Sequence, residues 1–526
     1  MNRLLSTFVV GLAGIQGITL AGEVRPRLVV GIVVDQLRTD YLEDLRDMFS
    51  SGGFRRLMDN GLYLRDVDFV VSPGDAASAS AIIQTGAYPR QNGIPGSMVY
   101  QPSAKTLKPV FLDPAYIGNF TTETYSPSAL KVTTLTDEIS LDGQGKSRIH
   151  SIAPDAAQAI VLAGHEAKSS FWVNDETGKW SSSTYYPYPP AYLQNINYNS
   201  PLVSRLDTIR WMPLRKDEPY PYVNSIDIKE GFRYTFPRSD RDVFTLYKNS
   251  PFVNRDITDA ATDYVRSQGL GLNPETTDVL NLGYTLSPYP AITDEDYRYE
   301  LQDSYLRLDK DLERLFNTLD RQVGRDNVVV YLVSTGYFNQ RPFAEGESRM
   351  PGGTFSVKRA LSLLNSYFAA KYGNGSYVDG FSDNQIFFDK KEIEAKNLDI
   401  NAVAQEARDF LIKMSGVADA YTLTDLISPS IPELEAHRLA LDPKTAGELI
   451  VEFNPGWNVV DDSKFPPETI VNKTTAYLFP GFIMGPGIEQ KTVDETVEAV
   501  TIAPTLANAL HIRSPNSTMS KPLKVK

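Results

Sequence analysis

The feature that most constrains the fold is an unbroken apolar run near the start of the chain. Leu28 to Val34 reads LVVGIVV and ends at Asp35. A strand that is apolar on both faces is typical of a parallel sheet covered by helices. A second run, Val328–Val333, follows a stretch in which large apolar residues recur every three or four positions, as on one face of a helix. These patterns predict an α/β sandwich with a central, mostly parallel sheet between helices.

Two long stretches differ from this pattern, and we expect them to be insertions. One is rich in Tyr, Pro, Asn and Ser with weak periodicity, and we interpret it as an irregular, aromatic-rich lid. The other predicts a small α+β unit, with a helix near Phe355–Lys371, a strand at Gln385–Phe388 and a helix at Ile400–Ser415. We expect Val29–Val34 and Val328–Val333 in one sheet and both insertions outside it. The predicted division is a core of 22–165, 276–345 and 456–526, the aromatic-rich insertion 166–275 and the α+β insertion 346–455.

Charge and composition exclude several classes of function. The 526 residues include 52 Lys and Arg against 65 Asp and Glu, a formal net charge of −13. Nonspecific nucleic-acid binding needs a basic surface, so we expect no nucleic-acid partner. The chain has no cysteine, which excludes disulfides, thiolate metal sites and a cysteine nucleophile. Any imidazole ligand must come from four histidines, which are His150, His165, His437 and His511.

The first residues have the pattern of a secretory signal peptide. Arg3 gives a short positive start, Leu4–Leu20 is largely apolar, and Ala21 and Gly22 are small enough for cleavage. The alternative is an uncleaved membrane anchor, but several glycines and a glutamine make this stretch a poor span. We therefore expect residues 1–21 to be removed, leaving a periplasmic or otherwise exported protein with no membrane span.

Several motifs along the chain carry a resemblance to a known family. They occur in the expected order and cover nearly all of the mature chain: Val29–Arg38, Gly53–Leu57, Thr85-Gly86, Gln91–Gly96, Ala163–His165, Ser170–Trp172, Thr177–Trp180, Ser183–Tyr186, Asp303–Asp311 and Pro455–Trp457. The chain resembles the alkaline phosphatase superfamily, most closely the exported phosphate-irrepressible alkaline phosphatases and the nucleotide pyrophosphatase/phosphodiesterases. The resemblance implies two zinc ions that activate a Thr or Ser nucleophile for phosphoryl transfer.

The resemblance also identifies where the catalytic groups should stand, and most are changed. Asp35 matches the first metal-ligand aspartate. Ala76 stands at the position of the nucleophile, and Ser97 stands at that of an oxygen-binding asparagine. The Lys-x-Arg pair of the family falls on Asp155 and Ala157. This exchange removes two positive charges and adds a negative one, which opposes a phosphate dianion.

The remaining metal-ligand positions have lost their ligands as well. They fall on Pro288, Ile292, Thr335, Gly336 and, by the weakest alignment, Leu478. Asp35 is then the only ligand left, and with its partners gone it is better explained as a polar residue that makes a turn hydrogen bond at a strand end. None of the four histidines lies at a ligand position. We therefore expect no cofactor, although the family uses two zinc ions.

Three functions follow as hypotheses. The first is an exported pseudoenzyme that binds or scaffolds an unknown envelope protein or glycan. The second is a residual metal-dependent phosphomonoesterase or phosphodiesterase with a rebuilt site. The third is a glycan- or peptide-binding protein that uses aromatic side chains of the 166–275 insertion, which include Trp172, Trp180, Tyr185, Tyr186, Tyr188 and Trp211. The loss at so many positions, with the flanking motifs intact, favours the first hypothesis.

Overall fold

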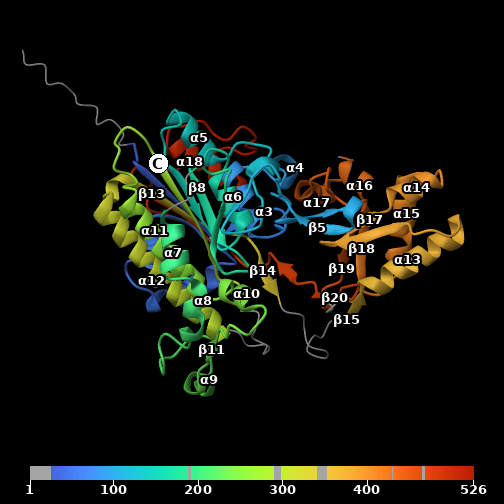
Figure 1. Cartoon of the computed structure of the whole chain (residues 1–526), viewed down its shortest axis with the longest axis horizontal. Helices are drawn as coiled ribbons and strands as arrows, with labels where there is room; N and C mark the ends of the chain where they lie inside the picture. Colours follow the sequence, from blue (N-terminus) through green and yellow to red (C-terminus); the bar gives the residue numbers. More distant parts are fainter. Residues whose placement is uncertain are drawn as a thin grey trace, which may run out of the picture.

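The fold is a large sheet between two layers of helices, with a smaller unit projecting from one end (Figure 1). The computed structural model describes residues 25–187, 191–289, 298–340, 352–428, 431–464 and 468–525. The predicted signal peptide and its cleavage site lie outside these residues. Within them, the helices are all too short or too polar to cross a membrane.

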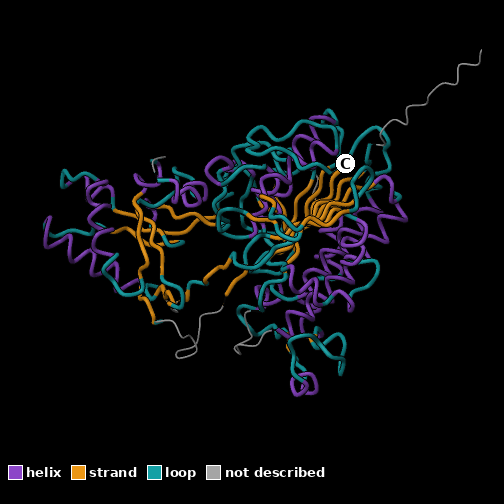
Figure 2. Tube along the Cα trace, turned by 180° about the vertical axis from the view of Figure 1, so that it is seen from behind, coloured by secondary structure: helices purple, strands orange, loops and turns teal. Residues whose placement is uncertain are grey.

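The main sheet has ten strands, and its centre is parallel. Figure 2 shows these strands stacked side by side, apart from the strands of the projecting unit. In spatial order they are β24 (Lys491–Val493), β2 (Leu62–Leu64), β23 (Gly481–Met484), β13 (Val328–Ser334), β1 (Leu28–Asp35), β12 (Asp278–Thr285), β7 (Ile149–Ile152), β8 (Ser169–Val173), β9 (Trp180–Ser183) and β6 (Gly118–Asn119).

Strand β1 lies between β12 and β13 and is parallel to both. Val29 pairs with Val279 on one side and with Val329 on the other. This confirms the prediction that the two apolar runs are interior strands of one sheet. The run is continuous because each face of β1 packs into its own hydrophobic cluster, with Val30 and Ile32 in one and Val29 and Val33 in the other.

The two helical layers use these two clusters. One face is covered by α1 (Thr39–Asp44), α2 (Phe54–Asn60), α11 (Pro251–Ser267) and α12 (Arg298–Gln322). The other face is covered by α3 (Ala76–Thr85), α5 (Leu135–Asp142), α6 (Ala156–Ala163) and α18 (Ile502–Ala509). The predicted α/β class is therefore confirmed. Short elements join the layers, namely α4 (Pro89–Asn92), the pair β3 (Val67–Asp68) and β25 (Val497–Glu498), the hairpin β4 (Met98–Gln101) and β5 (Thr106–Pro109), and the pair β14 (Phe338–Gln340) and β22 (Asn472–Thr474).

The first insertion is smaller than the predicted range 166–275. Strands β8 and β9 fall within 166–275 but belong to the main sheet, and α11 covers one of its faces. The prediction that this whole stretch lies outside the sheet is therefore wrong. The two strands are short and buried throughout, so they carry no apolar–polar alternation that would mark them. The inserted elements proper are α7 (Ala191–Asn199), α8 (Leu202–Arg205), β10 (Arg210–Trp211), α9 (Ser225–Glu230), β11 (Tyr234–Thr235) and α10 (Val243–Lys248).

The second insertion is the projecting unit, with its own sheets and its own hydrophobic cluster. Its strand at Gln385–Phe388 is found where it was predicted, and Asp399 caps the helix that begins at Ile400. Its elements within the predicted bounds are β15 (Gly353–Ser356), α13 (Val357–Tyr372), β16 (Val378–Ser382), β17 (Gln385–Phe388), α14 (Lys390–Ala395), α15 (Ile400–Leu411), β18 (Val417–Thr422), α16 (Leu423–Ile427), α17 (Glu435–Ala440) and β19 (Leu449–Phe453). The predicted end at residue 455 is too early, because β20 (Trp457–Asp461) and β21 (Glu468–Thr469) form one sheet with β15.

Candidate functional site

A cavity of about 180 Å³ opens at the carboxyl ends of the central strands. Asp35 ends β1 and Thr285 ends β12, and both residues line the cavity. Ala76, the first residue of α3, lies on its wall. In open α/β sheets, ligands bind outside the carboxyl ends of the strands. This cavity, which we call the sheet-edge cavity, is therefore the candidate site.

The oxygens of Asp35 are held by neighbouring side chains. Thr335 Oγ1 donates to Asp35 Oδ1 at 3.0 Å, and Gln36 Nε2 donates to Asp35 Oδ2 at 3.0 Å. Tyr337 also hydrogen-bonds this carboxyl group. Burial raises the pKa of Asp35, and the hydrogen bonds from Tyr337, Gln36 and Thr335 oppose that rise. Asp35 is thus more than the turn residue that the sequence favoured, because it lines the cavity and is held by three side chains.

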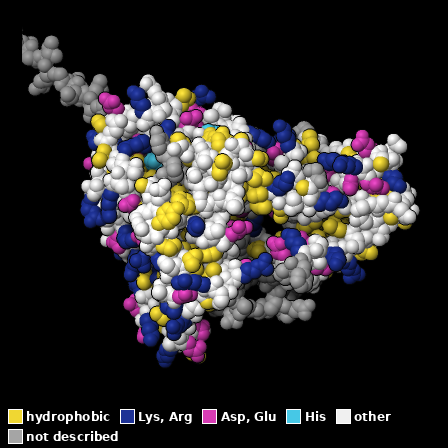
Figure 3. Space-filling view, in the orientation of Figure 1, with side chains coloured by type: hydrophobic (Ala, Val, Ile, Leu, Met, Phe, Trp, Pro, Cys, Tyr) yellow, Lys and Arg dark blue, Asp and Glu magenta, His cyan; other side chains and the backbone are white. Residues whose placement is uncertain are grey.

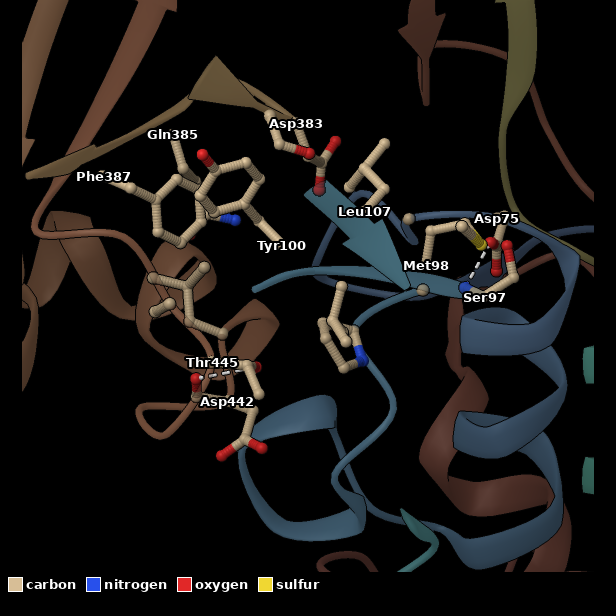
Figure 4. A pocket seen from close by; sticks show the side chains of 17 residues that line it. Asp75, Ser97, Met98, Tyr100, Leu107, Asp383, Gln385, Phe387, Asp442 and Thr445 are labelled. Carbon is tan, nitrogen blue, oxygen red and sulfur yellow. Dashed lines mark hydrogen bonds between the residues drawn. The ribbon is translucent and has the colours of Figure 1, made fainter. Parts of the chain in front are cut away.

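Asp75 links the start of α3, where the family has its nucleophile, to Ser97, where the family has its asparagine. Asp75 Oδ1 accepts hydrogen bonds from the backbone N–H groups of Ala77 and Ser78 at 3.0 Å each, and so caps α3. Asp75 Oδ2 accepts from Ser97 N at 2.6 Å, and this bond is drawn in Figure 4. Ala76 has no nucleophilic atom, and the donors at the start of α3 are already used by Asp75.

A lysine of the first insertion brings positive charge into the sheet-edge cavity. Lys248, the last residue of α10, is 6% exposed, and its ammonium group contacts Asp155 and lies 2.7 Å from Asp175. Both carboxylates keep more than half of their side chains exposed, at 58% and 59%. Burial acts to lower the pKa of Lys248, but the two carboxylates raise it above its ordinary value, so the amine is charged.

The sequence reasoning missed Lys248 because a single lysine in an irregular insertion carries no motif. The sequence analysis placed Asp155 at the position of the family's lysine and assigned it no partner, whereas the structure brings it together with Asp175 and Lys248. Gln158, which follows Ala157 in the chain, also lines this cavity. Its side chain is 2% exposed, and its Nε2 atom has no hydrogen-bond partner among the described residues. Ala157, the other residue of the altered pair, is half-buried against the core.

The remaining ligand positions do not converge on a metal. Thr335 is buried and bonded to Asp35. A Cβ atom on Gly336 would lie 2.0 Å from Cδ2 of Phe69, so no ligand side chain fits there. Pro288 has no coordinating side chain, and Leu478 has none and is 46% exposed. Ile292 lies outside the described residues.

The histidines do not supply the missing ligands. His150 Nδ1 lies 2.8 Å from Ser169 Oγ, His165 Nδ1 lies 2.8 Å from Asp137, and His437 Nε2 lies 2.8 Å from Glu452. In the described part of the chain, His, Asp and Glu side chains do not gather in groups of three or more that could hold a metal. The residues present therefore do not fit the two zinc ions of the family.

The tryptophans of the stretch 166–275 and Tyr186 form packing rather than a binding surface. Those described as buried are Trp172, Trp180, Tyr186 and Trp211, each at most 3% exposed, and Tyr185 is half-buried. Tyr188 lies outside the described residues. Trp211 donates its Nε1 hydrogen to Asp303 Oδ2 at 2.7 Å, which fixes the insertion to α12. This burial argues against the hypothesis of an aromatic glycan- or peptide-binding surface.

A larger cleft of about 570 Å³ separates the main body from the second insertion, and Figure 3 shows a hollow between them. A neighbouring pocket, shown in Figure 4, lies between the β4–β5 hairpin and this insertion. Two of its carboxylates are already engaged: Asp75 caps α3, and Asp442 pairs with Lys131 at 2.7 Å. Size alone therefore does not identify the site, and the sheet-edge cavity has the better-placed chemistry.

The chain resembles known proteins over nearly its whole length. The family model for type I phosphodiesterase / nucleotide pyrophosphatase matches residues 29–477. Alkaline phosphatase PafA of Elizabethkingia meningoseptica is 28% identical, covering 95% of this chain and 94% of that protein. Alkaline phosphatase PhoV of Synechococcus elongatus is 27% identical, covering 94% and 92%. The crystal structure of wild-type PafA superposes with a TM-score of 0.79 and 26% identity, covering 95% of this chain and 98% of that one.

These similarities correct the functional expectation and confirm the predicted superfamily. The expectation of a pseudoenzyme with a binding or scaffolding role is wrong. The matching family model describes phosphodiesterases and pyrophosphatases, and the curated relatives PafA and PhoV are alkaline phosphatases. The replaced motif residues had suggested a lost activity, whereas the fold of the family is kept. The findings instead favour the alternative of a phosphoesterase. The matched region spans most of the chain, so this protein belongs to the type I phosphodiesterase / nucleotide pyrophosphatase family, within the alkaline phosphatase superfamily.

Proposed function

We propose that this protein is a phosphoesterase that hydrolyses phosphate esters in the sheet-edge cavity. The observation that carries the proposal is the buried Lys248 ammonium group, which lies beside carboxylates at the carboxyl edge of the sheet. A fixed positive charge can bind a phosphoryl oxygen and stabilise the charge that develops there during transfer. Family membership supports the same reaction class.

The residues of the cavity suggest direct attack by water. With Ala76 at the first position of α3, no hydroxyl stands at the inherited nucleophile position. Asp155 and Asp175 expose carboxylate oxygens that can accept a proton from water. In the proposed step, the water oxygen forms a bond to phosphorus and its proton passes to one of these carboxylates. The bond from phosphorus to the ester oxygen breaks, and the alcohol leaves with a proton from solvent. No step is assigned to zinc, since the residues do not fit it.

Hydrolysis of 4-nitrophenyl phosphate and bis(4-nitrophenyl) phosphate tests this proposal. We expect slow release of nitrophenolate by the purified protein, reduced at least about tenfold in the double variant Asp155→Asn/Asp175→Asn because the base is lost. Asp419→Asn, on β18 of the second insertion, is the matched control and should hydrolyse at the parental rate. Release no faster than in buffer, or equal release by the double variant, would contradict the proposal.

We also infer that the protein acts outside the cytoplasm. The support is the sequence of residues 1–21, with its positive start, apolar stretch and small residues before Gly22. N-terminal sequencing of the protein from its native envelope should begin near Gly22. A chain that retains Met1 in the membrane fraction would show that this segment is an anchor.

A further inference from the structure

The positive charge in the sheet-edge cavity is a side chain of the protein, the ammonium group of Lys248. Lys248 reaches the cavity from α10, where its ammonium group is buried between Asp155 and Asp175. Asp155 stands where the family resemblance places a lysine, so the positive charge absent from α6 is supplied here by another element. Two carboxylates, Asp155 and Asp175, hold this charge in place.

Two donors in this cavity are available to a ligand. An ammonium group has three N–H donors, and two of them are directed to Asp155 and Asp175, which leaves one. Gln158 contributes the second, because its buried Nε2 atom has no partner among the described residues. A buried donor without a partner is destabilising, so an acceptor such as a phosphoryl oxygen would be stabilised there.

The balance of charge limits what kind of phosphate ester can bind. The cavity is lined by three carboxyl groups, Asp35, Asp155 and Asp175, and by one ammonium group, Lys248. A monoester carries two negative charges at alkaline pH, whereas a diester carries one. Repulsion from the carboxylates grows with the charge of the ligand, so the diester is opposed less.

We propose that Lys248 is the built-in binding cation of the sheet-edge cavity, and that it holds singly charged phosphodiesters without a divalent metal. This inference rests on the proposed phosphoesterase site and names its ligand class. Lys248 contacts a phosphoryl oxygen with its remaining donor, Gln158 contributes a second hydrogen bond, and Asp155 and Asp175 hold the ammonium group in place.

Calorimetry at pH 8 in the presence of EDTA tests the inference without requiring turnover. The probes are dimethyl phosphate, which carries one negative charge, and methyl phosphate, which carries two. We expect dimethyl phosphate to bind the full-length protein, more tightly than methyl phosphate and with the same affinity after zinc is added. Lys248→Met should weaken dimethyl phosphate at least about tenfold, as expected for loss of a charged hydrogen bond, and Lys248→Arg should retain most of the affinity.

Two further variants separate a binding role from a structural one. Lys131→Met removes a lysine that pairs with buried Asp442 outside the cavity. This variant should bind dimethyl phosphate with the affinity of the parent protein. Gln158→Leu keeps the size of the side chain but removes the free donor, and should weaken binding without lowering the melting temperature. Lys248→Met should remain folded because both of its carboxylate partners can hydrate at the surface.

The outcomes are distinct from those of the hydrolysis assay. Metal-free binding that needs Lys248, without turnover, would contradict the proposed function and leave this inference standing. The inference itself is overturned if dimethyl phosphate does not bind, if binding needs zinc, if methyl phosphate binds more tightly, or if Lys248→Met binds as the parent does.

Discussion

The two insertions of this protein relate to the main body in different ways. The first shares its hydrophobic cluster with the sheet and the helix α12, so that Trp211 and Phe236 belong to the same core as Ile32. The second has a cluster of its own, built around Leu364 and Phe368, and its own sheets. The first insertion also places Lys248 in the sheet-edge cavity. An insertion that shares the core can therefore contribute a residue to the sheet-edge cavity. The second insertion, which has its own core, lines the larger cleft between it and the main body.

The largest effect that tests this comparison should come from Trp211→Ala. The side chain is 1% exposed, and its Nε1 atom donates to buried Asp303. Losing the ring and leaving Asp303 short of a donor should lower the free energy of unfolding of the main body by about 4–5 kcal/mol. Urea unfolding followed by far-UV circular dichroism measures it. Ile226→Ala, on α9 of the same insertion and 66% exposed, should change the value by less than about 0.5 kcal/mol.

Phe368→Ala should have a somewhat smaller effect that stays within the second insertion. The ring is fully buried in that unit's own cluster, so its removal should cost about 3–4 kcal/mol locally. Hydrogen exchange should accelerate in β17 and β19 and remain slow in β1 and β12. Leu363→Ala, on the same helix but 42% exposed, is the control. Equal acceleration in β1 would show that the two units unfold as one.

Acid should weaken the main body through His150, with a smaller effect. Burial, with the positive charges of Arg148 and Lys168, lowers the pKa of His150 to about 3. Between that value and its ordinary pKa near 6.5, the unfolded chain binds a proton that the folded chain does not. The stability from neutral His150 is thus complete above pH 6.5 and declines as pH falls towards 3, by about 2 kcal/mol at pH 5.

Urea unfolding at pH 7 and pH 5 checks this sign. His150→Gln, which keeps a polar group near Ser169, should lose less stability over that interval than the parent does. His437→Gln is the matched control in the second insertion, where the imidazole pairs with Glu452 at a partly exposed position. A parent protein that gains stability on acidification from pH 7 to 5, with His150→Gln lacking that gain, would reverse the assignment.

The smallest predicted effect concerns a helix cap in the second insertion. Asp399 Oδ1 accepts a hydrogen bond from Asn401 N at 3.0 Å and caps α15. Asp399→Ala should lower the stability of this unit by about 1 kcal/mol. Asp409→Ala, an exposed position on the same helix, should be near neutral. The thermal unfolding midpoint of the second unit measures both changes, and equal losses would show that the cap contributes nothing.

The sequence predicted the frame of the molecule because its signals are local. The apolar runs at Val29–Val34 and Val328–Val333 had to be buried on both faces, and they pair with each other as β1 and β13 at the centre of the sheet. The strand Gln385–Phe388 and the start of the helix at Ile400 were also predicted, since strand and helix patterns act over a few residues. The short strands β8 and β9 were assigned to the insertion because four or five buried residues carry no distinguishing period.

The sequence by itself determined the fold family, the position of Asp35 at the end of the first strand, and the residues that replace the family's nucleophile and ligands. Only the tertiary structure decided what fills the site. Asp155, Asp175 and Lys248 are up to 93 positions apart in the chain (248 − 155 = 93), and no sequence pattern connects them. Their meeting depends on the first insertion packing into the main core, because that packing carries α10 to the sheet edge and buries its last side chain between two carboxylates.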